Sequence, residues 1–140
     1  MCLLVWCYFI CERLNKKGIY GPEGHLWSRG EEIEAEAVHR IITMAKEINT
    51  PLYVVHIMKP SAAEVVRDAK KKGYVVFAEA LASGLGVDGR HCYHHDFNHA
   101  SGYVMSPALD DKPMTKELLF KLLATHDLDT TATDNCVFTK

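Results

Sequence analysis

This 140-residue sequence lacks the features that mark several special classes of protein. Its five cysteines are odd in number and contain no C-x-x-C pair, which disfavours a disulfide framework or a zinc ribbon. The same pattern favours a reducing compartment, so we expect a cytoplasmic protein. The formal net charge of −2 gives no electrostatic basis for binding nucleic acid or an anionic membrane. We therefore expect neither among its partners.

The longest apolar run, residues 1–10, is too short to span a bilayer, which takes about 20 residues. A secretory signal is disfavoured because the run lacks a basic start and a small-residue cleavage site. Val, Trp, Tyr, Phe and Ile are good strand formers, so a buried strand is the plainer interpretation. The other interpretation is that residues 1–17 diverge from the fold formed by residues 18–140.

Helical periodicity first appears after Ser28, which forms an apparent capping box with Glu31. Glu32, Glu34 and Glu36 lie largely off the apolar stripe and predict a solvated face. Ser61 and Glu64 form a second apparent capping box, and a third helix is expected over residues 115–125. The stripe itself is predicted to face inward and comprises Ile33, Ala37, Ile41, Ala45 and Ile48.

Three segments predict strands: residues 52–57, 74–78 and 128–133. The first is continuously apolar apart from one histidine, which is typical of a strand buried on both faces of a parallel sheet. Because strands alternate with helices, we expect an α/β fold with parallel strands. The long irregular stretch over residues 81–113, with one short helix near residues 96–104, is of a length that is usually functional.

Two residues with metal-binding side chains end predicted strands. His56 lies near the end of residues 52–57, and Asp134 follows the last strand. Chemistry in α/β proteins gathers at the carboxyl ends of parallel strands, and zinc accepts both imidazole and carboxylate ligands. Local alternatives remain open, since His56 can be a hydrogen-bonded core residue and Asp134 an Asx turn or helix cap.

Other polar residues favour structural interpretations. The histidines of residues 91–99 resemble a metal site, but no strand holds them, and a polar surface loop is favoured. Glu79, at a strand end, is interpreted as a salt-bridged or solvated carboxylate rather than a buried acid or a support for a site residue. Ser106 lies before a proline, where a turn is expected. The histidines of residues 91–99 mentioned above are His91, His94, His95 and His99.

Several separate segments, in the right order, resemble the dihydropyrimidinases, which are cyclic amidohydrolases. The resemblance runs from about residue 18 to the end. It is carried by Gly21-Pro-Glu-Gly-His25, Glu34-Ala-Glu-Ala37, Pro51-Leu-Tyr-Val-Val-His56-Ile-Met58, Ser61-Ala-Ala63, Leu85-Gly-Val-Asp-Gly89 and Thr133-Asp-Asn-Cys136.

The resemblance implies a TIM-type (β/α) barrel with two zinc ions, which opens 5,6-dihydropyrimidine or hydantoin rings. It implies that His56 binds one zinc, that Asp134 binds the other and carries a proton, and that Ser106 binds substrate. It also implies a tetramer. The collapsin response mediator proteins share the fold but carry other residues where this chain has His56 and Asp134, so the chain resembles the enzymes more closely.

The family's His-x-His pair, carboxylated lysine and further histidine ligand are missing from this sequence. A closed barrel takes about 250 residues, so we expect an incomplete barrel and a fragment that is inactive alone. The main alternative is a non-catalytic module that associates with full-length homologues. A weaker alternative is a small doubly wound α/β domain with its own ligand.

Overall fold

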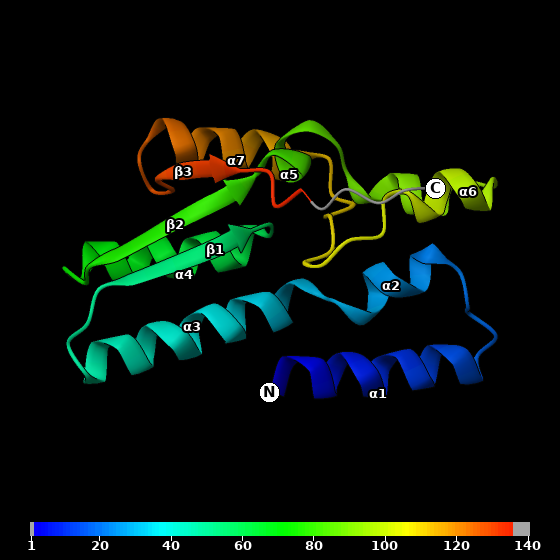
Figure 1. The fold of residues 1–140 in the computed structure, drawn as a ribbon, viewed down its shortest axis with the longest axis horizontal. Coiled ribbons are helices and arrows are strands. Elements are labelled where there is room, and N and C mark those ends of the chain that lie inside the picture. The colour runs from blue at the N-terminus through cyan, green and yellow to red at the C-terminus, as the bar shows by residue number, and fades with distance from the viewer. Residues whose placement is uncertain (1, 136–140) are drawn as a thin grey trace.

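The computed structural model describes residues 2–135, with side chains from residue 5 onward, so Cys136 lies outside the described residues. Its centre is a parallel three-stranded sheet in the order β1-β2-β3 (Figure 1). The strands are β1 (Leu52–Ile57), β2 (Val76–Leu81) and β3 (Thr130–Ala132). Helices α4 (Pro60–Lys71) and α7 (Met114–Ala124) precede β2 and β3. The prediction of an α/β fold with parallel strands is confirmed.

The predicted N-terminal strand is wrong, because α1 (Cys2–Lys16) is a helix. Two more helices follow, α2 (Pro22–Ser28) and α3 (Glu31–Glu47), and α1 runs beside them on the side away from the sheet (Figure 1). Cys7 is buried, whereas Trp6 and Phe9 are exposed. Strand-forming residues need a neighbouring strand, and here the neighbours of α1 are helices. Among residues 2–135, no helix combines the length and the apolar content required to cross a bilayer.

The long segment between β2 and α7 contains three short helical turns. They are α5 (Ala82–Gly86), the 3₁₀ helix η1 (Gly89–Tyr93) and α6 (Phe97–Ser101), which takes the place of the short helix expected near residues 96–104. This segment packs on α2 through a small cluster of buried residues. The cluster comprises Leu26, Cys92 and Ala108, with Tyr103 against it.

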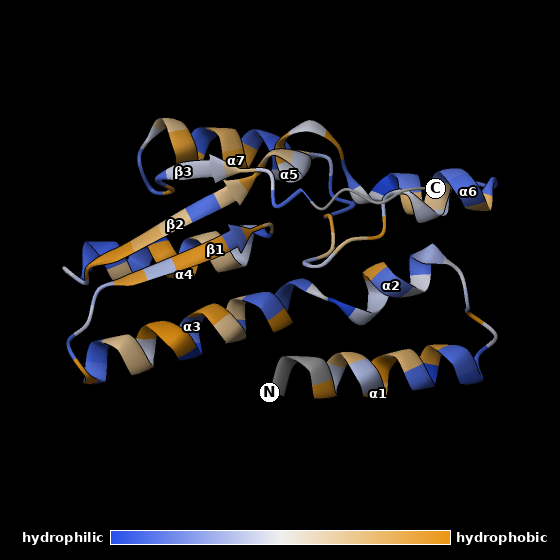
Figure 2. Cartoon of the chain, in the orientation of Figure 1, coloured by the Kyte–Doolittle hydropathy of each residue, from blue (hydrophilic) through white to orange (hydrophobic). Residues whose placement is uncertain are grey.

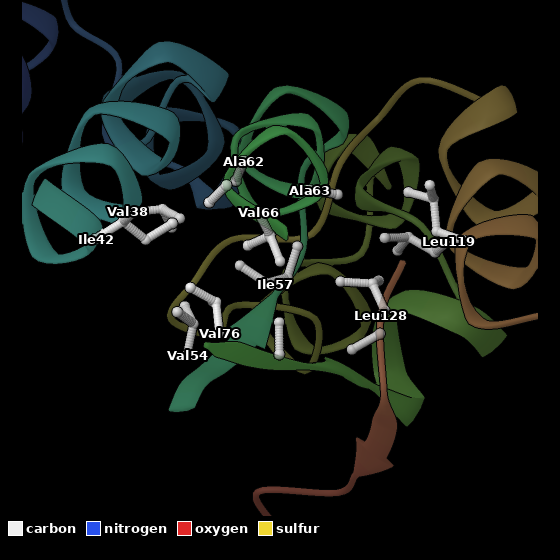
Figure 3. Packing of buried hydrophobic residues seen from close by; sticks show 14 residues of the cluster. Val38, Ile42, Val54, Ile57, Ala62, Ala63, Val66, Val76, Leu119 and Leu128 are labelled. Carbon is white, nitrogen blue, oxygen red and sulfur yellow. The ribbon is translucent and has the colours of Figure 1, made fainter. Parts of the chain in front are cut away.

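The main core lies between one face of the sheet and helices α3, α4 and α7 (Figure 3). The predicted stripe on α3 is partly wrong, because Ile41 and Ile48 are exposed while Val38 and Ile42 are buried. Helix α3 packs against α4, and this contact turns the buried face by about one residue. Figure 3 shows the side chains that pack together in this core between the sheet and the helices, among them Val38, Ile42, Val54, Ile57, Ala62, Val66, Val76, Leu119 and Leu128.

The other face of the sheet is open. Strands β1 and β2 are largely hydrophobic along their length (Figure 2), as expected for strands buried on both faces. Yet Tyr53, Val55 and Phe77 are 48%, 47% and 48% exposed. The prediction that β1 is buried on both faces is therefore wrong for this chain, because the described residues cover only about half of each of these side chains.

Neither predicted capping box forms. Ser28 is the last residue of α2, and its buried hydroxyl donates a hydrogen bond to the carbonyl of His25 over 2.9 Å. Helix α3 begins after Gly30, and α4 begins after Lys59, without a side-chain cap from its own segment. Sequence spacing alone cannot show that a partner from another helix has taken the capping role.

Two glutamates of α3 take that role for α4. The Oε1 atom of Glu31 accepts the Ser61 N–H over 3.0 Å. The Oε1 atom of Glu34 accepts the N–H groups of Met58 and Lys59 over 2.8 and 3.1 Å. The first N–H groups of a helix have no partner within the helix and attract negative charge, so the Glu31 carboxylate stabilises this end, whereas Glu34 binds the turn just before it. The predicted solvated face is therefore wrong at Glu34.

We predict that Glu34 makes the stability of the chain depend on pH. Burial raises the pKa of Glu34 from 4.5 to about 7, although the two backbone N–H groups oppose this. The folded state then binds a proton more tightly than the unfolded state. The free energy of unfolding should therefore fall as pH rises from about 4.5 to about 7, by about 3 kcal/mol in total.

In Glu34→Gln this contribution to the slope should be absent. Urea denaturation from about pH 5 to about pH 8 measures the slope directly. Glu32→Gln is the matched control, because Glu32 is exposed on the same helix and should keep the wild-type slope. An unchanged slope in Glu34→Gln would contradict the assignment.

Candidate functional site

His56 lies where the regular pairing of β1 with β2 breaks. Val54 pairs with Ala78 and Ile57 pairs with Ala80, so β1 uses one residue more than β2 over this step. This is the geometry of a β-bulge, which redirects side chains next to sites. His56 has a positive φ of 44°, a left-handed conformation that histidine adopts more readily than most residues.

The Glu79 carboxylate occupies the same end of the strand pair. Its Oε2 atom accepts a hydrogen bond from the Tyr53 hydroxyl over 2.6 Å, and its Oε1 atom accepts the His56 N–H over 3.2 Å. The bond to Glu79 raises the pKa of Tyr53. Glu79 is 8% exposed and forms no salt bridge with any described residue. The interpretation of Glu79 as a salt-bridged or solvated carboxylate is therefore wrong.

A cavity of about 400 Å³ runs along the edge of β1 that does not pair with β2. His56 lines it, and so does Ser106, which lies 50 residues further along the chain in the segment before α7. The peptide bond between Ser106 and Pro107 is cis. The structure thus brings two of the three predicted site residues to one cavity, whose other walls include Cys7, Arg29, Ile33, Ala37, Ile41 and Ala108.

Asp134, the third predicted residue, lies just beyond β3 and is exposed. It has a positive φ of 45° and does not line the cavity. The carboxyl ends of the parallel strands point to the same side of the molecule (Figure 1). His56, near the end of β1, and Asp134, just after β3, therefore both lie at the carboxyl end of the sheet. Because β2 lies between their strands, the two strand ends are about 10 Å apart.

His25 supports the wall that contains Ser106, a contact that the sequence did not indicate. Its Nε2 atom is 2.6 Å from the carbonyl oxygen of Met105, the residue before Ser106. Burial lowers the pKa of His25, and the nearby Arg29 adds to this, although the bond to Met105 opposes it. The only signal in the sequence was that His25 belongs to the Gly21–His25 segment that resembles the family.

The histidines of residues 91–99 contact one another. The Nδ1 atom of His91 is 3.1 Å from the Nε2 atom of His99, and the ring of His94 lies 4.1 Å from that of His99 and 4.3 Å from that of His95. The His91 ring also stacks on Tyr103 at 4.1 Å. Among the side chains described, those of residues 5–135, no three of His, Cys, Asp or Glu converge closely enough to hold a metal ion, and this includes the histidine cluster.

The described residues alone do not fit a catalytic zinc site. Imidazole and carboxylate are suitable donors, but catalytic zinc has three protein ligands and an open position for water. His56 and Asp134 supply two donors, and no third joins them among residues 2–135. Any zinc chemistry at this edge of the sheet requires ligands beyond those described.

The chain is similar in sequence to several proteins that are much longer, although no family model matches it. It is 55% identical to dihydropyrimidinase 2 of Caenorhabditis elegans over 128 residues. This matching region covers 91% of the chain and 25% of that protein. The dihydropyrimidinase of Rattus norvegicus is 50% identical over 86% of the chain and 23% of its own length. The human dihydropyrimidinase-related protein 5 is 43% identical over 87% of the chain and 22% of its own length.

Solved structures give the same result. A D-hydantoinase crystal structure matches 95% of the chain and 28% of its own length with a TM-score of 0.90 and 28% identity. The D-hydantoinase (dihydropyrimidinase) of Thermus sp. matches 95% of the chain and 29% of its own length with a TM-score of 0.90 and 31% identity. In sequence and in fold, this chain is therefore similar to one segment of the dihydropyrimidinases and hydantoinases, and it spans about a quarter of the length of these relatives.

Proposed function

We propose that this chain carries part of the site of a metal-dependent hydrolase that opens cyclic amides, either 5,6-dihydropyrimidines or hydantoins. The observation that supports this most directly is His56, which leaves β1 at a bulge in a positive-φ conformation and lines one cavity with Ser106. The similarity to proteins named dihydropyrimidinase, at 50–55% identity, supports the same chemistry.

The proposed roles follow the chemistry of each side chain. His56 and Asp134 would each help to hold a zinc ion once further ligands complete the site, because imidazole nitrogen and carboxylate oxygen are both good donors to zinc; the resemblance to the family implies that they would serve different ions of a pair. Asp134 also carries a proton, since a carboxylate has a second oxygen that is free to accept one. Ser106 binds the substrate ring through its hydroxyl, and its place in the cavity wall beside His56 supports this role.

We predict that the isolated chain does not open dihydrouracil or hydantoin rings, even with added zinc. Two donors fall short of the three that a catalytic zinc needs, and activation of water depends on the bound ion. Chromatographic detection of the ring-opened product measures this directly. Turnover by the isolated chain that disappears in His56→Ala or Asp134→Ala would contradict the prediction.

A chimera is the positive arm of the same experiment. This chain would replace the matching segment of dihydropyrimidinase 2 of Caenorhabditis elegans, and the chimera should open the ring. His56→Ala and Asp134→Ala should each lower its kcat/KM by at least about 100-fold. His39→Ala is the control, because His39 is exposed on α3 and should leave activity unchanged. Equal activity in all variants would exclude the proposed roles.

A second candidate function is a non-catalytic module that associates with longer homologues or with itself, and the open sheet favours it. Within the described residues, β1 pairs only with β2, so its other edge offers unpaired backbone groups. Tyr53, Val55 and Phe77 add exposed apolar surface beside this edge. Unprotected edges and apolar patches of this kind promote association. The tetramer implied by the family would use further surfaces.

We predict that the purified chain self-associates through this open face, so that light scattering coupled to size-exclusion chromatography gives a mass above 15.8 kDa. Val55→Lys places a charge on the face and should weaken association by at least about 10-fold, since a charged residue blocks edge pairing. Val5→Lys is the matched control, because Val5 is also about half exposed but lies on α1, away from the sheet. A monomeric wild-type chain with a cooperative melt would exclude this candidate.

A further inference from the structure

The bulge in β1 leaves a backbone group that the sheet does not satisfy. At the start of the strand, the Leu52 N–H donates to the carbonyl of Val75 over 3.0 Å, as in a regular parallel pair. Alternate N–H groups of a strand face the same neighbour, so the His56 N–H also faces β2. Near His56 the pairing of β1 with β2 shifts by one residue, and the His56 N–H donates to a side chain of β2 instead of a backbone carbonyl.

The side chain that meets it is Glu79. One oxygen of its carboxylate accepts the His56 N–H over 3.2 Å, and the other accepts the Tyr53 hydroxyl over 2.6 Å. The two donors lie three residues apart on β1, so a single carboxylate of β2 contacts one residue just before the irregular stretch and one within it. A carboxylate that is 8% exposed would be costly to bury without such partners.

We propose that Glu79 is a positioning residue for His56. Its carboxylate takes the place of the missing ladder carbonyl, holds the bulge, and keeps His56 in the left-handed conformation from which its side chain lines the cavity. The functional consequence depends on the proposed role of His56, whereas the effect on the conformation of His56 does not.

The geometry explains why a carboxylate suits this position. A bulge leaves a backbone N–H without its usual carbonyl partner on the neighbouring strand. A side chain with two acceptor oxygens can accept that N–H with one oxygen and be held in place through the other. The Tyr53 hydroxyl is the anchor, because it fixes Oε2 and thereby orients Oε1 towards the strand end. A shorter or neutral side chain at residue 79 would lose one of the two contacts or weaken it.

The experiment is amide hydrogen exchange of the full 140-residue chain, followed by NMR at the His56 N–H. Glu79→Ala should speed exchange at His56 by about 10- to 100-fold, because a hydrogen bond to a charged acceptor is lost. The exchange rate at His56 is divided by the exchange rate of the Val66 amide in the core, and this ratio corrects for any general loss of stability. Faster exchange at His56 alone is the expected result.

Asp129→Ala is the matched control. The Oδ2 atom of Asp129 also accepts a backbone N–H of the sheet, that of Ala78 over 2.7 Å, but Asp129 has no hydrogen bond to His56. It should leave the corrected exchange at His56 unchanged. An equal increase in Asp129→Ala and Glu79→Ala would overturn the proposal, because the effect would then be general.

Glu79→Gln keeps the proposal testable if Glu79→Ala does not fold. Glutamine retains one acceptor oxygen, so exchange at His56 should rise only about 3- to 10-fold, as expected for a neutral acceptor. Wild-type exchange in both Glu79 variants would overturn the proposal. In the active chimera, Glu79→Ala should lower kcat with KM unchanged, and an inactive chimera would count against the proposed function while leaving the exchange result intact.

Discussion

The site depends on a buried polar network that holds the turn after β1. Glu34 of α3 accepts the N–H groups of Met58 and Lys59, and the Lys59 amine, itself in a residue only 5% exposed, donates to the carbonyl of Leu109 over 3.0 Å. The same amine lies 3.4 Å from the carboxylate of Asp110. A buried ammonium is tolerated only when its donors are satisfied, so these contacts are mutually dependent. They also fix residues 106–108, immediately before Leu109, against the strand end that carries His56.

The two faces of the sheet differ because only one has partners within this chain. Helices α3, α4 and α7 cover one face with a continuous apolar core. The opposite face carries Tyr53, Val55 and Phe77, each about half exposed, together with Glu79. In a (β/α)₈ barrel the inward face of each strand packs against side chains from the other strands. Three strands cannot provide that cover, so this face keeps a patch of half-exposed apolar side chains.

The sequence predicted what short-range patterns determine. Residues 52–57 form β1 as expected, α7 lies within one residue of the predicted range, and His56 and Asp134 were located at strand ends from the sequence alone. The errors involve contacts between distant residues. The N-terminal helix, the half-buried Glu34 and the capping of α4 by residues of α3 all depend on partners 20 or more residues away or on helix packing. The bulge and its Glu79 contact could not be inferred, because Glu79 was expected at the end of its strand and lies within β2 instead.

Left-handed backbone alone does not mark a site in this chain. Asn49 and His126 share it with His56 and Asp134, and both of them lie in turns after helices. Asparagine, aspartate and histidine adopt this conformation more easily than most residues, so residue type explains part of the pattern. What distinguishes His56 is that a buried carboxylate takes its N–H and that it shares a cavity wall with Ser106. Asp134 has neither feature among the described residues. Strand β2 lies beside both β1 and β3, but the Glu79 carboxylate accepts its hydrogen bonds from β1. Among the described residues, the His56 end of the proposed site therefore has a supporting contact that the Asp134 end lacks.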